Sequence, residues 1–139
     1  MNTVVRACLF IYFYFFILYV ETLLRSGGFN AARRCLLHPW KPTLRHVNLS
    51  EEFINDVGWT LERACSWQYF NAECLHRAIV SYHFTRALGA CPTLRIGVSS
   101  QPFLSHAWVE LDGRPIADAP GWNVRDRIGG ILLTFPEAS

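Results

Sequence analysis

The stretch over residues 71–118 constrains the fold more than any other part of the sequence. It starts with a helical pattern over residues 71–88, which Gly89 can end because glycine readily adopts the left-handed conformation found after a helix. Three short strands are predicted after this helix, over residues 93–99, 105–110 and 114–118. Asp112-Gly113 marks a hairpin between the last two strands. A helix followed by neighbouring antiparallel strands predicts an α+β fold, with N-terminal helices packed on a small antiparallel sheet.

The composition fits one folded domain. A chain of 139 residues is long enough to bury a hydrophobic core. Apolar residues make up 51% and charged residues 17%, which excludes a disordered chain. The net charge of +2 is too small to indicate nucleic acid as the main partner.

The cysteines indicate free thiols rather than a scaffold. They lie at positions 8, 35, 65, 74 and 91. None of them forms a Cys-x-x-Cys pair, so we expect no structural zinc site. An odd number at irregular spacing does not indicate a disulfide framework. We therefore expect reduced thiols in a cytoplasmic protein.

The N-terminal part carries an apolar run over residues 7–20, bounded by Arg6 and Glu21. The run is shorter than the roughly 20 residues that span a bilayer, which favours a buried or interfacial helix. A basic residue before an apolar run is also typical of a signal sequence, although no small-x-small cleavage site follows. A buried or interfacial helix is the prediction, and a membrane span or signal sequence is the alternative.

Breaks in the pattern divide the chain into two parts. Glycines in the segment 26–28 interrupt the first helical pattern, and Pro39 and Pro42 force an extended linker. We predict an N-terminal helical segment over residues 1–48 and a core over residues 49–139.

A second helix is predicted to start near the capping box formed by Asn48 and Glu51. Its apolar stripe recurs at helical spacing and consists of Ile54, Val57, Leu61, Ala64 and Cys65. Cys65 is therefore interpreted as a core thiol. Gly58 weakens this helix by roughly 1 kcal/mol relative to alanine, which indicates close packing at that position.

The helix over residues 71–88 brings a cysteine into a reactive position. If Asn71 is its N-cap, Cys74 lies in the first turn, where unpaired backbone N–H groups and the helix dipole favour a thiolate. A thiol nucleophile needs a base, and the base needs an acceptor that fixes its tautomer. His106 at the start of a strand and Asp118 at the end of the next can fill these roles. Cys74, His106 and Asp118 form the candidate catalytic triad.

The hairpin loop decides whether the histidine and the carboxylate share a face, because side chains alternate along a strand. A two-residue loop pairs Leu111 with Arg114 and sends Asp118 to the face opposite His106. A three-residue loop with a bulge pairs Glu110 with Arg114 and sets His106 directly opposite Asp118. We predict the three-residue loop, because it also creates favourable cross-strand pairs. On this reasoning, pairing of Leu111 with Arg114 would remove Asp118 from the triad.

Three further polar residues lie on or near this helix. His76 points about 200° around the helix from Cys74, which predicts a surface or substrate-groove residue rather than the base. His83 on the same helix is interpreted as structural. Gln68, six residues before the cysteine, is the candidate oxyanion donor beside the Cys74 backbone N–H.

The order of a cysteine at a helix start, a histidine on a strand and an aspartate on the next strand is that of papain-like and transglutaminase-like enzymes. Four strings are more specific: Cys74-Leu-His-Arg-Ala, Leu94-Arg-Ile-Gly-Val98, Ser105-His-Ala-Trp-Val-Glu110 and Gly113-Arg-Pro-Ile-Ala-Asp118. Together they resemble the stand-alone leader peptidase of lasso-peptide biosynthesis, most strongly over residues 50–120.

The resemblance implies a transglutaminase-like or papain-like core and a cysteine endopeptidase that removes the leader from a ribosomally made lasso precursor peptide. It makes Cys74 the nucleophile, His106 the base and then the acid, and Asp118 the orienting carboxylate, without a metal or organic cofactor. It also implies a separate leader-recognition protein and an ATP-dependent lasso cyclase as partners, since the segment before the core holds an apolar run in place of a recognition domain.

Two alternatives stay open at this point. The same triad supports acyl transfer to an amine, as in transglutaminases. A non-catalytic adaptor anchored to a membrane through residues 7–20 is the other alternative, with Cys74 as an inert thiol.

Overall fold

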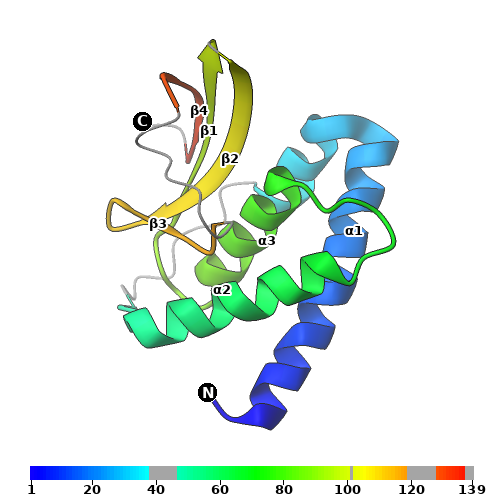
Figure 1. Cartoon of the computed structure of the whole chain (residues 1–139), viewed down its shortest axis with the longest axis vertical. Helices are drawn as coiled ribbons and strands as arrows, with labels where there is room; N and C mark the ends of the chain where they lie inside the picture. The colour runs from blue at the N-terminus through cyan, green and yellow to red at the C-terminus, as the bar shows by residue number, and fades with distance from the viewer. Residues whose placement is uncertain (38–46, 101, 119–127, 137–139) are drawn as a thin grey trace.

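Three helices precede a four-stranded sheet in the part of the chain that the computed structural model describes, which comprises residues 1–37, 47–100, 102–118 and 128–136 (Figure 1). The helices are α1 (Thr3–Leu36), α2 (Glu51–Ser66) and α3 (Cys74–Ala87). The strands are β1 (Thr93–Ser100), β2 (Phe103–Leu111), β3 (Arg114–Ile116) and β4 (Gly130–Phe135). The predicted α+β class, with helices against a small antiparallel sheet, is confirmed.

The sheet is antiparallel with the strand order β3-β2-β1-β4, so β3 and β4 form its edges. Strand β4 has no counterpart in the sequence-based prediction. Strand β3 ends at Ile116, two residues earlier than predicted. Among the described residues, β3 therefore pairs only with the last three residues of β2, Val109, Glu110 and Leu111.

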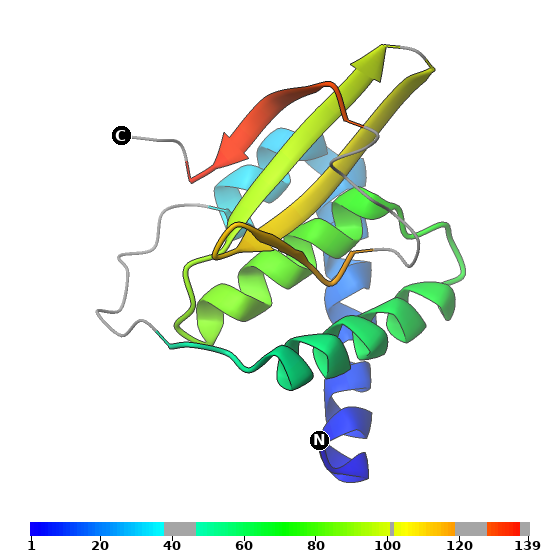
Figure 2. The ribbon, with the colours of Figure 1, turned by 60° about the vertical axis from the view of Figure 1, so that its left-hand side comes forward.

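Helix α3 forms the middle layer of the molecule, because it packs against β2 and β1 on one side and against α1 on the other (Figure 2). Because it is covered on both sides, its Ile79 and Tyr82 side chains are almost completely buried. The core continues into α1 through Phe13 and Ile17 and into the sheet through Leu94. One continuous core therefore joins the helices to the sheet.

Helix α1 is buried along only one face. Phe13, Ile17 and Val20 are fully buried, whereas Phe15 on the opposite face is 63% exposed. Gly28 interrupts the helix with a φ of 63°, as the glycine pattern predicted. The prediction of a buried helix thus holds for one face. By length and composition α1 is also the one helix in the described ranges that is long enough and apolar enough to cross a membrane.

The division of the chain at residue 48 stays a prediction. The linker with Pro39 and Pro42, on which that division depends, lies outside the described residues.

Helix α2 starts two residues later than the predicted capping box. Its N-cap is Ser50 rather than Asn48, and the Ser50 side chain accepts a hydrogen bond of 3.2 Å from the Phe53 N–H. The thiol of Cys65 is buried as predicted, and burial raises its pKa to about 11. Gly58 also packs closely, since a Cβ there would lie 3.2 Å from the Cα of Ala117.

The predicted three-residue hairpin loop is wrong. Strand pairing joins Leu111 to Arg114, which leaves a two-residue loop. Both loop residues have positive φ, 51° at Asp112 and 76° at Gly113, as a type I′ turn requires. Because aspartate tolerates the left-handed conformation, the loop closes without the bulge that we had expected.

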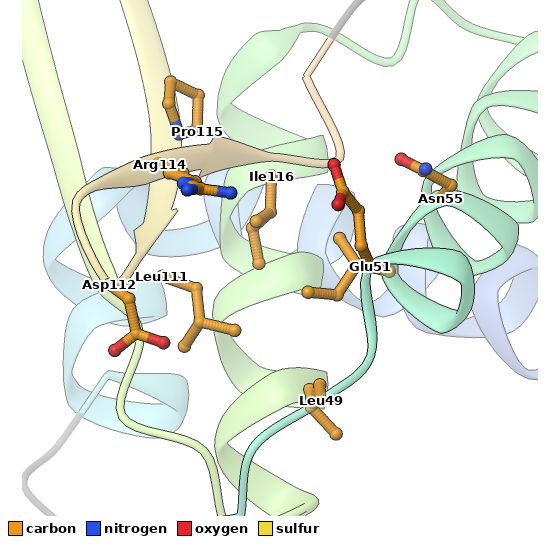
Figure 3. A pocket seen from close by; sticks show the side chains of 9 residues that line it. Leu49, Glu51, Asn55, Leu111, Asp112, Arg114, Pro115 and Ile116 are labelled. Atoms are coloured by element: carbon orange, nitrogen blue, oxygen red, sulfur yellow. The ribbon is translucent and has the colours of Figure 1, made fainter.

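A cavity of about 390 Å³ lies between β3 and the N-terminal half of α2 (Figure 3). Apolar side chains line it, including those of Leu49, Ile54 and Ile116. Glu51 and Arg114 lie at its rim in the close view. Beyond this cavity, α2 packs closely on the segment after β3, where Gly58 meets Ala117.

The packing around Gly97 predicts a strong effect of one methyl group. A Cβ at Gly97 would lie 2.4 Å from Ile128 Cγ2 and 3.0 Å from the Gly130 carbonyl oxygen. We expect Gly97→Ala to lower the free energy of unfolding by about 1–3 kcal/mol, measured by urea denaturation. Gly130→Ala is the matched control, since a Cβ there has no neighbour within 4 Å. Equal stability of the two variants would contradict this packing.

Candidate active site

Cys74 is the first residue of α3. The N-cap is Glu73 rather than the predicted Asn71, so Cys74 lies two positions closer to the helix start than expected. It remains in the first turn, where backbone N–H groups are not used within the helix. Its side chain is half-buried, whereas Cys8 and Cys91 are exposed.

His106 lies on β2 and is 3% exposed. Its Nε2 is 2.9 Å from Oδ1 of Asp118, a distance at which the ring N–H donates to the carboxylate. The ring also hydrogen bonds with the thiol of Cys74. Because Asp118 takes Nε2, the other ring nitrogen, Nδ1, is left for the thiol. The structure therefore brings together the three residues of the candidate triad.

Asp118 reaches His106 despite the two-residue loop. Strand pairing sets Val109 opposite Ile116, and a continuing strand would place Asp118 opposite Ala107 on the wrong face. The strand stops instead, and Ala117 has a φ of 50°, which turns the chain toward His106. The expectation that this register would remove Asp118 was wrong, because it assumed a strand that continues to residue 118.

Helix α2 packs directly on this redirected segment. A Cβ at residue 58 would lie 3.2 Å from the Cα of Ala117, closer than an ordinary van der Waals contact. A positive φ is uncommon for alanine and persists only where the surroundings hold it. The sequence had indicated close packing at Gly58, but it gave no sign that the partner would be the residue before the carboxylate.

The early end of β3 gives the thiol a backbone donor. Leu111 and Arg114 close the hairpin as a hydrogen-bonded pair, so every second residue of β2 directs its N–H toward β3. Val109 still has a partner in Ile116, but Ala107 lies beyond the end of β3. Its backbone N–H hydrogen bonds to Cys74 instead. No pattern in the sequence pointed to this donor.

These contacts favour an ion pair between Cys74 and His106. Burial alone would raise the pKa of the thiol, but hydrogen bonds from His106 and from the backbone N–H groups of Ala107 and Leu75 outweigh it, so the pKa is lowered. Burial alone would lower the pKa of His106, but Asp118 and Cys74 reverse this effect and raise it to about 9. Both shifts stabilise thiolate and imidazolium together.

The side-chain amide of Gln68 already donates to two backbone carbonyls. Its Nε2 donates to the backbone carbonyls of Tyr14 at 3.0 Å and Ala64 at 3.3 Å. To donate to an oxyanion, the amide would have to give up both hydrogen bonds. In this arrangement Gln68 ties the end of α2 to α1.

His76 is not the surface residue that its helical angle predicted. It is 6% exposed, and its Nε2 lies 2.6 Å from Oε2 of Glu21 on α1. His83 packs its ring against Phe16 with centroids 4.9 Å apart, in line with a structural role. Among the described residues, no cluster of three His, Cys, Asp or Glu side chains is arranged to hold a metal ion.

The sequence that forms this site matches a known protein family. The profile of the transglutaminase-like superfamily matches residues 16–128, which is well over half of the chain. The chain belongs to the transglutaminase-like superfamily. The matched region of this transglutaminase-like protein contains all three candidate residues and also the second half of α1.

A separate comparison with individual proteins finds a relative. The chain is 39% identical over 62 residues to the Microcin J25-processing protein McjB of Escherichia coli. The match covers 45% of this chain and 29% of McjB, so the chain spans less than a third of its relative. No solved structure matches the chain significantly. Both comparisons agree with the resemblance that the sequence strings indicated.

The ion pair predicts how Cys74 reacts with iodoacetamide. Because its pKa is lowered, Cys74 should remain a thiolate as the pH falls below the ordinary thiol range, and its alkylation should persist where that of Cys8 and Cys91 has stopped. Asp118→Asn should lower the pKa of His106 and raise that of Cys74, slowing alkylation roughly tenfold per pKa unit. Peptide mass mapping across a pH series measures each cysteine separately.

Asp112→Asn is the matched control, since it removes a carboxylate from the same hairpin without touching His106. Its profile should equal that of the wild type. If alkylation of Cys74 in the wild type depended on pH in the same way as alkylation of Cys91, the ion pair would be contradicted.

Proposed function

We propose that this protein is a cysteine peptidase that removes the leader from a lasso precursor peptide before the macrolactam is closed. The observation that carries the proposal is the contact of a lowered-pKa thiol with a histidine that is bonded to a carboxylate. The similarity to a microcin-processing protein and the sequence strings support the substrate class.

In the proposed reaction the Cys74 thiolate attacks the carbonyl carbon at the leader–core junction. The peptide C–N bond breaks, and the His106 imidazolium gives its proton to the departing amine of the core peptide. The leader is then held as a thioester on Cys74. Neutral His106 then takes a proton from water, and the hydroxide attacks the thioester carbonyl. The C–S bond breaks, which returns the Cys74 thiolate beside the His106 imidazolium and releases the leader as a free acid. Asp118 holds the ring in the required tautomer throughout.

The backbone supplies the proposed oxyanion donor. The Cys74 N–H lies at the N-terminus of α3, where the helix dipole favours negative charge. Gln68 stays a weaker proposal, because its amide donates to two carbonyls instead.

The proposed partners follow from the chemistry of the product. Cleavage frees the α-amine of the core peptide, which is the nucleophile needed for macrolactam formation. We therefore propose coupling to an ATP-dependent lasso cyclase, and a separate leader-recognition protein that delivers the precursor. Both proposals rest on the resemblance of this chain to leader peptidases.

Membrane contact through α1 is proposed as part of this function in the cytoplasm. A stripe at helical spacing along α1 is exposed and free of charge: Val4, Cys8, Ile11, Phe15 and Tyr19. The opposite face packs on α2 and α3, which favours a helix lying in the interface over one that crosses the bilayer.

Flotation with vesicles of phosphatidylcholine and phosphatidylglycerol tests this contact. We expect the wild type to float with the vesicles and Ile11→Lys/Phe15→Lys to float less, because charge in the stripe opposes insertion. Leu132→Lys is the matched control, since Leu132 is 69% exposed and lies on β4 rather than in the α1 stripe. Equal flotation of all three proteins would contradict a role of α1, as would no flotation at all.

The peptidase itself is tested by mass spectrometry of the cognate precursor with its leader-binding partner. Wild type should release the leader, and Cys74→Ala should not, with a loss of at least about a thousandfold for a removed nucleophile. Cys91→Ala, which removes an exposed thiol elsewhere, should cleave normally. Cleavage by Cys74→Ala at the wild-type rate would refute the proposal.

Membership of the transglutaminase-like superfamily keeps acyl transfer as the second candidate, and the same experiment separates the two. With an added primary amine, a leader amide instead of a free acid would favour transfer. Absence of any product from a folded wild type would favour the non-catalytic adaptor.

A further inference from the structure

We propose that Glu21 and His76 are positioning residues, which hold the first turn of α3 and thereby hold Cys74 in contact with β2. This inference rests on the proposed function of Cys74 as the nucleophile. It gives helix α1 a part in the active site that the sequence did not indicate.

The hydrogen bonds of His76 define its role. Its Nδ1 accepts a hydrogen bond of 3.1 Å from the backbone N–H of Glu73, the N-cap of α3. A ring nitrogen that accepts carries no proton, so the proton of the neutral ring is on Nε2. That nitrogen lies 2.6 Å from Oε2 of Glu21 and donates to it. A single ring thus connects the start of α3 to α1.

Glu21 is itself held in place. It is hydrogen bonded to Arg25 one turn further along α1, and its side chain is only 13% exposed. These contacts lower the pKa of Glu21, with the Arg25 hydrogen bond as the largest cause and the His76 hydrogen bond next. The ring of Phe70, 5.5 Å from that of His76, covers another side of the cluster. The carboxylate is therefore fixed and charged.

Cys74 lies inside the turn that this cluster fixes. It follows Glu73, whose N–H is bound by His76, and precedes His76 itself by two residues. Its thiol must meet the Ala107 N–H and the His106 ring on the opposite side of α3. Such contacts tolerate little displacement, since a shift of about 1 Å in a catalytic group can cost roughly a hundredfold in rate. The contact of His76 with α1 fixes the turn and thereby keeps the thiol within hydrogen-bonding distance of Ala107 and His106.

The sequence comparison is consistent with this role. The transglutaminase-like match begins at residue 16, within α1, and therefore includes Glu21. The apolar part of α1 preceding residue 16 contributes its own ion pair, between Arg6 and Asp56 of α2 at 2.5 Å. Asp56 also binds α1 to its neighbour, and its side-chain hydrogen bonds and ion pairs in the described residues go to Met1 and Arg6 of the N-terminal segment. The ion pair of Arg6 and Asp56 is therefore a matched control for the contact between Glu21 and His76.

The test compares four variants by the pH profile of Cys74 alkylation with iodoacetamide, together with thermal unfolding. Glu21→Ala and His76→Ala should raise the pH midpoint of Cys74 toward that of the exposed Cys91, and slow its alkylation at neutral pH by roughly tenfold. Glu21→Gln keeps an oxygen that accepts from His76 and should behave like the wild type. Asp56→Ala should unfold at lower temperature without shifting the Cys74 midpoint.

His76→Leu fills the buried position without a ring nitrogen and replaces His76→Ala if that variant does not fold. An unchanged Cys74 midpoint in folded Glu21→Ala and in either His76 variant would overturn the inference. An equal shift in Asp56→Ala would also overturn it, since the effect would then follow stability alone. If Cys74 of the wild type has the same alkylation profile as Cys91, the proposal that Cys74 is the nucleophile is wrong. If the wild-type profile is shifted but the variants do not change it, only the positioning role of Glu21 and His76 is wrong.

Discussion

The contact between the first turn of α3 and the part of β2 that extends beyond its pairing with β3 is the constraint on which the candidate site depends. Strand β3 is only three residues long, and its early end exposes the backbone N–H of Ala107 to the thiol of Cys74. The same early end lets Ala117 turn the chain so that Asp118 reaches His106. A longer β3 would use the Ala107 N–H in the sheet and carry Asp118 to the opposite face. One short edge strand thus serves both the thiol and the carboxylate.

Much of the fold and the approximate place of the site could be predicted from the sequence, because these depend on local patterns. Helical spacing and glycine breaks set the helices, and the order of Cys74, His106 and Asp118 along them suggested a triad before any geometry was known. The prediction failed where tertiary contacts decide. The positive φ of Ala117 depends on helix α2, which packs against it from another part of the chain. His76 has the angle of a surface residue on an isolated helix, but α1 covers it.

Helix α1 combines two roles that usually belong to different segments. Its buried face completes the core through residues such as Phe13 and Ile17, and Glu21 at the end of the apolar run reaches His76 in the first turn of α3. Its other face carries uncharged, exposed side chains such as Phe15. The apolar run over residues 7–20 thus supplies both the buried face and the exposed face of α1, and Glu21 at its end contacts α3. A partner or lipid that binds the exposed face of α1 would therefore contact the same helix whose Glu21 is bonded to His76.

The resting state of the pair formed by Cys74 and His106 is the central claim, and ring-nitrogen NMR of histidine tests it most directly. We predict that both nitrogens of His106 carry protons at pH 7, and that the ring loses its charge only near pH 9 while Cys74 stays a thiolate. The ring should become neutral at lower pH when Asp118 is replaced by asparagine. A His106 ring that is already neutral at pH 7 in the wild type, with one nitrogen unprotonated, would contradict the account.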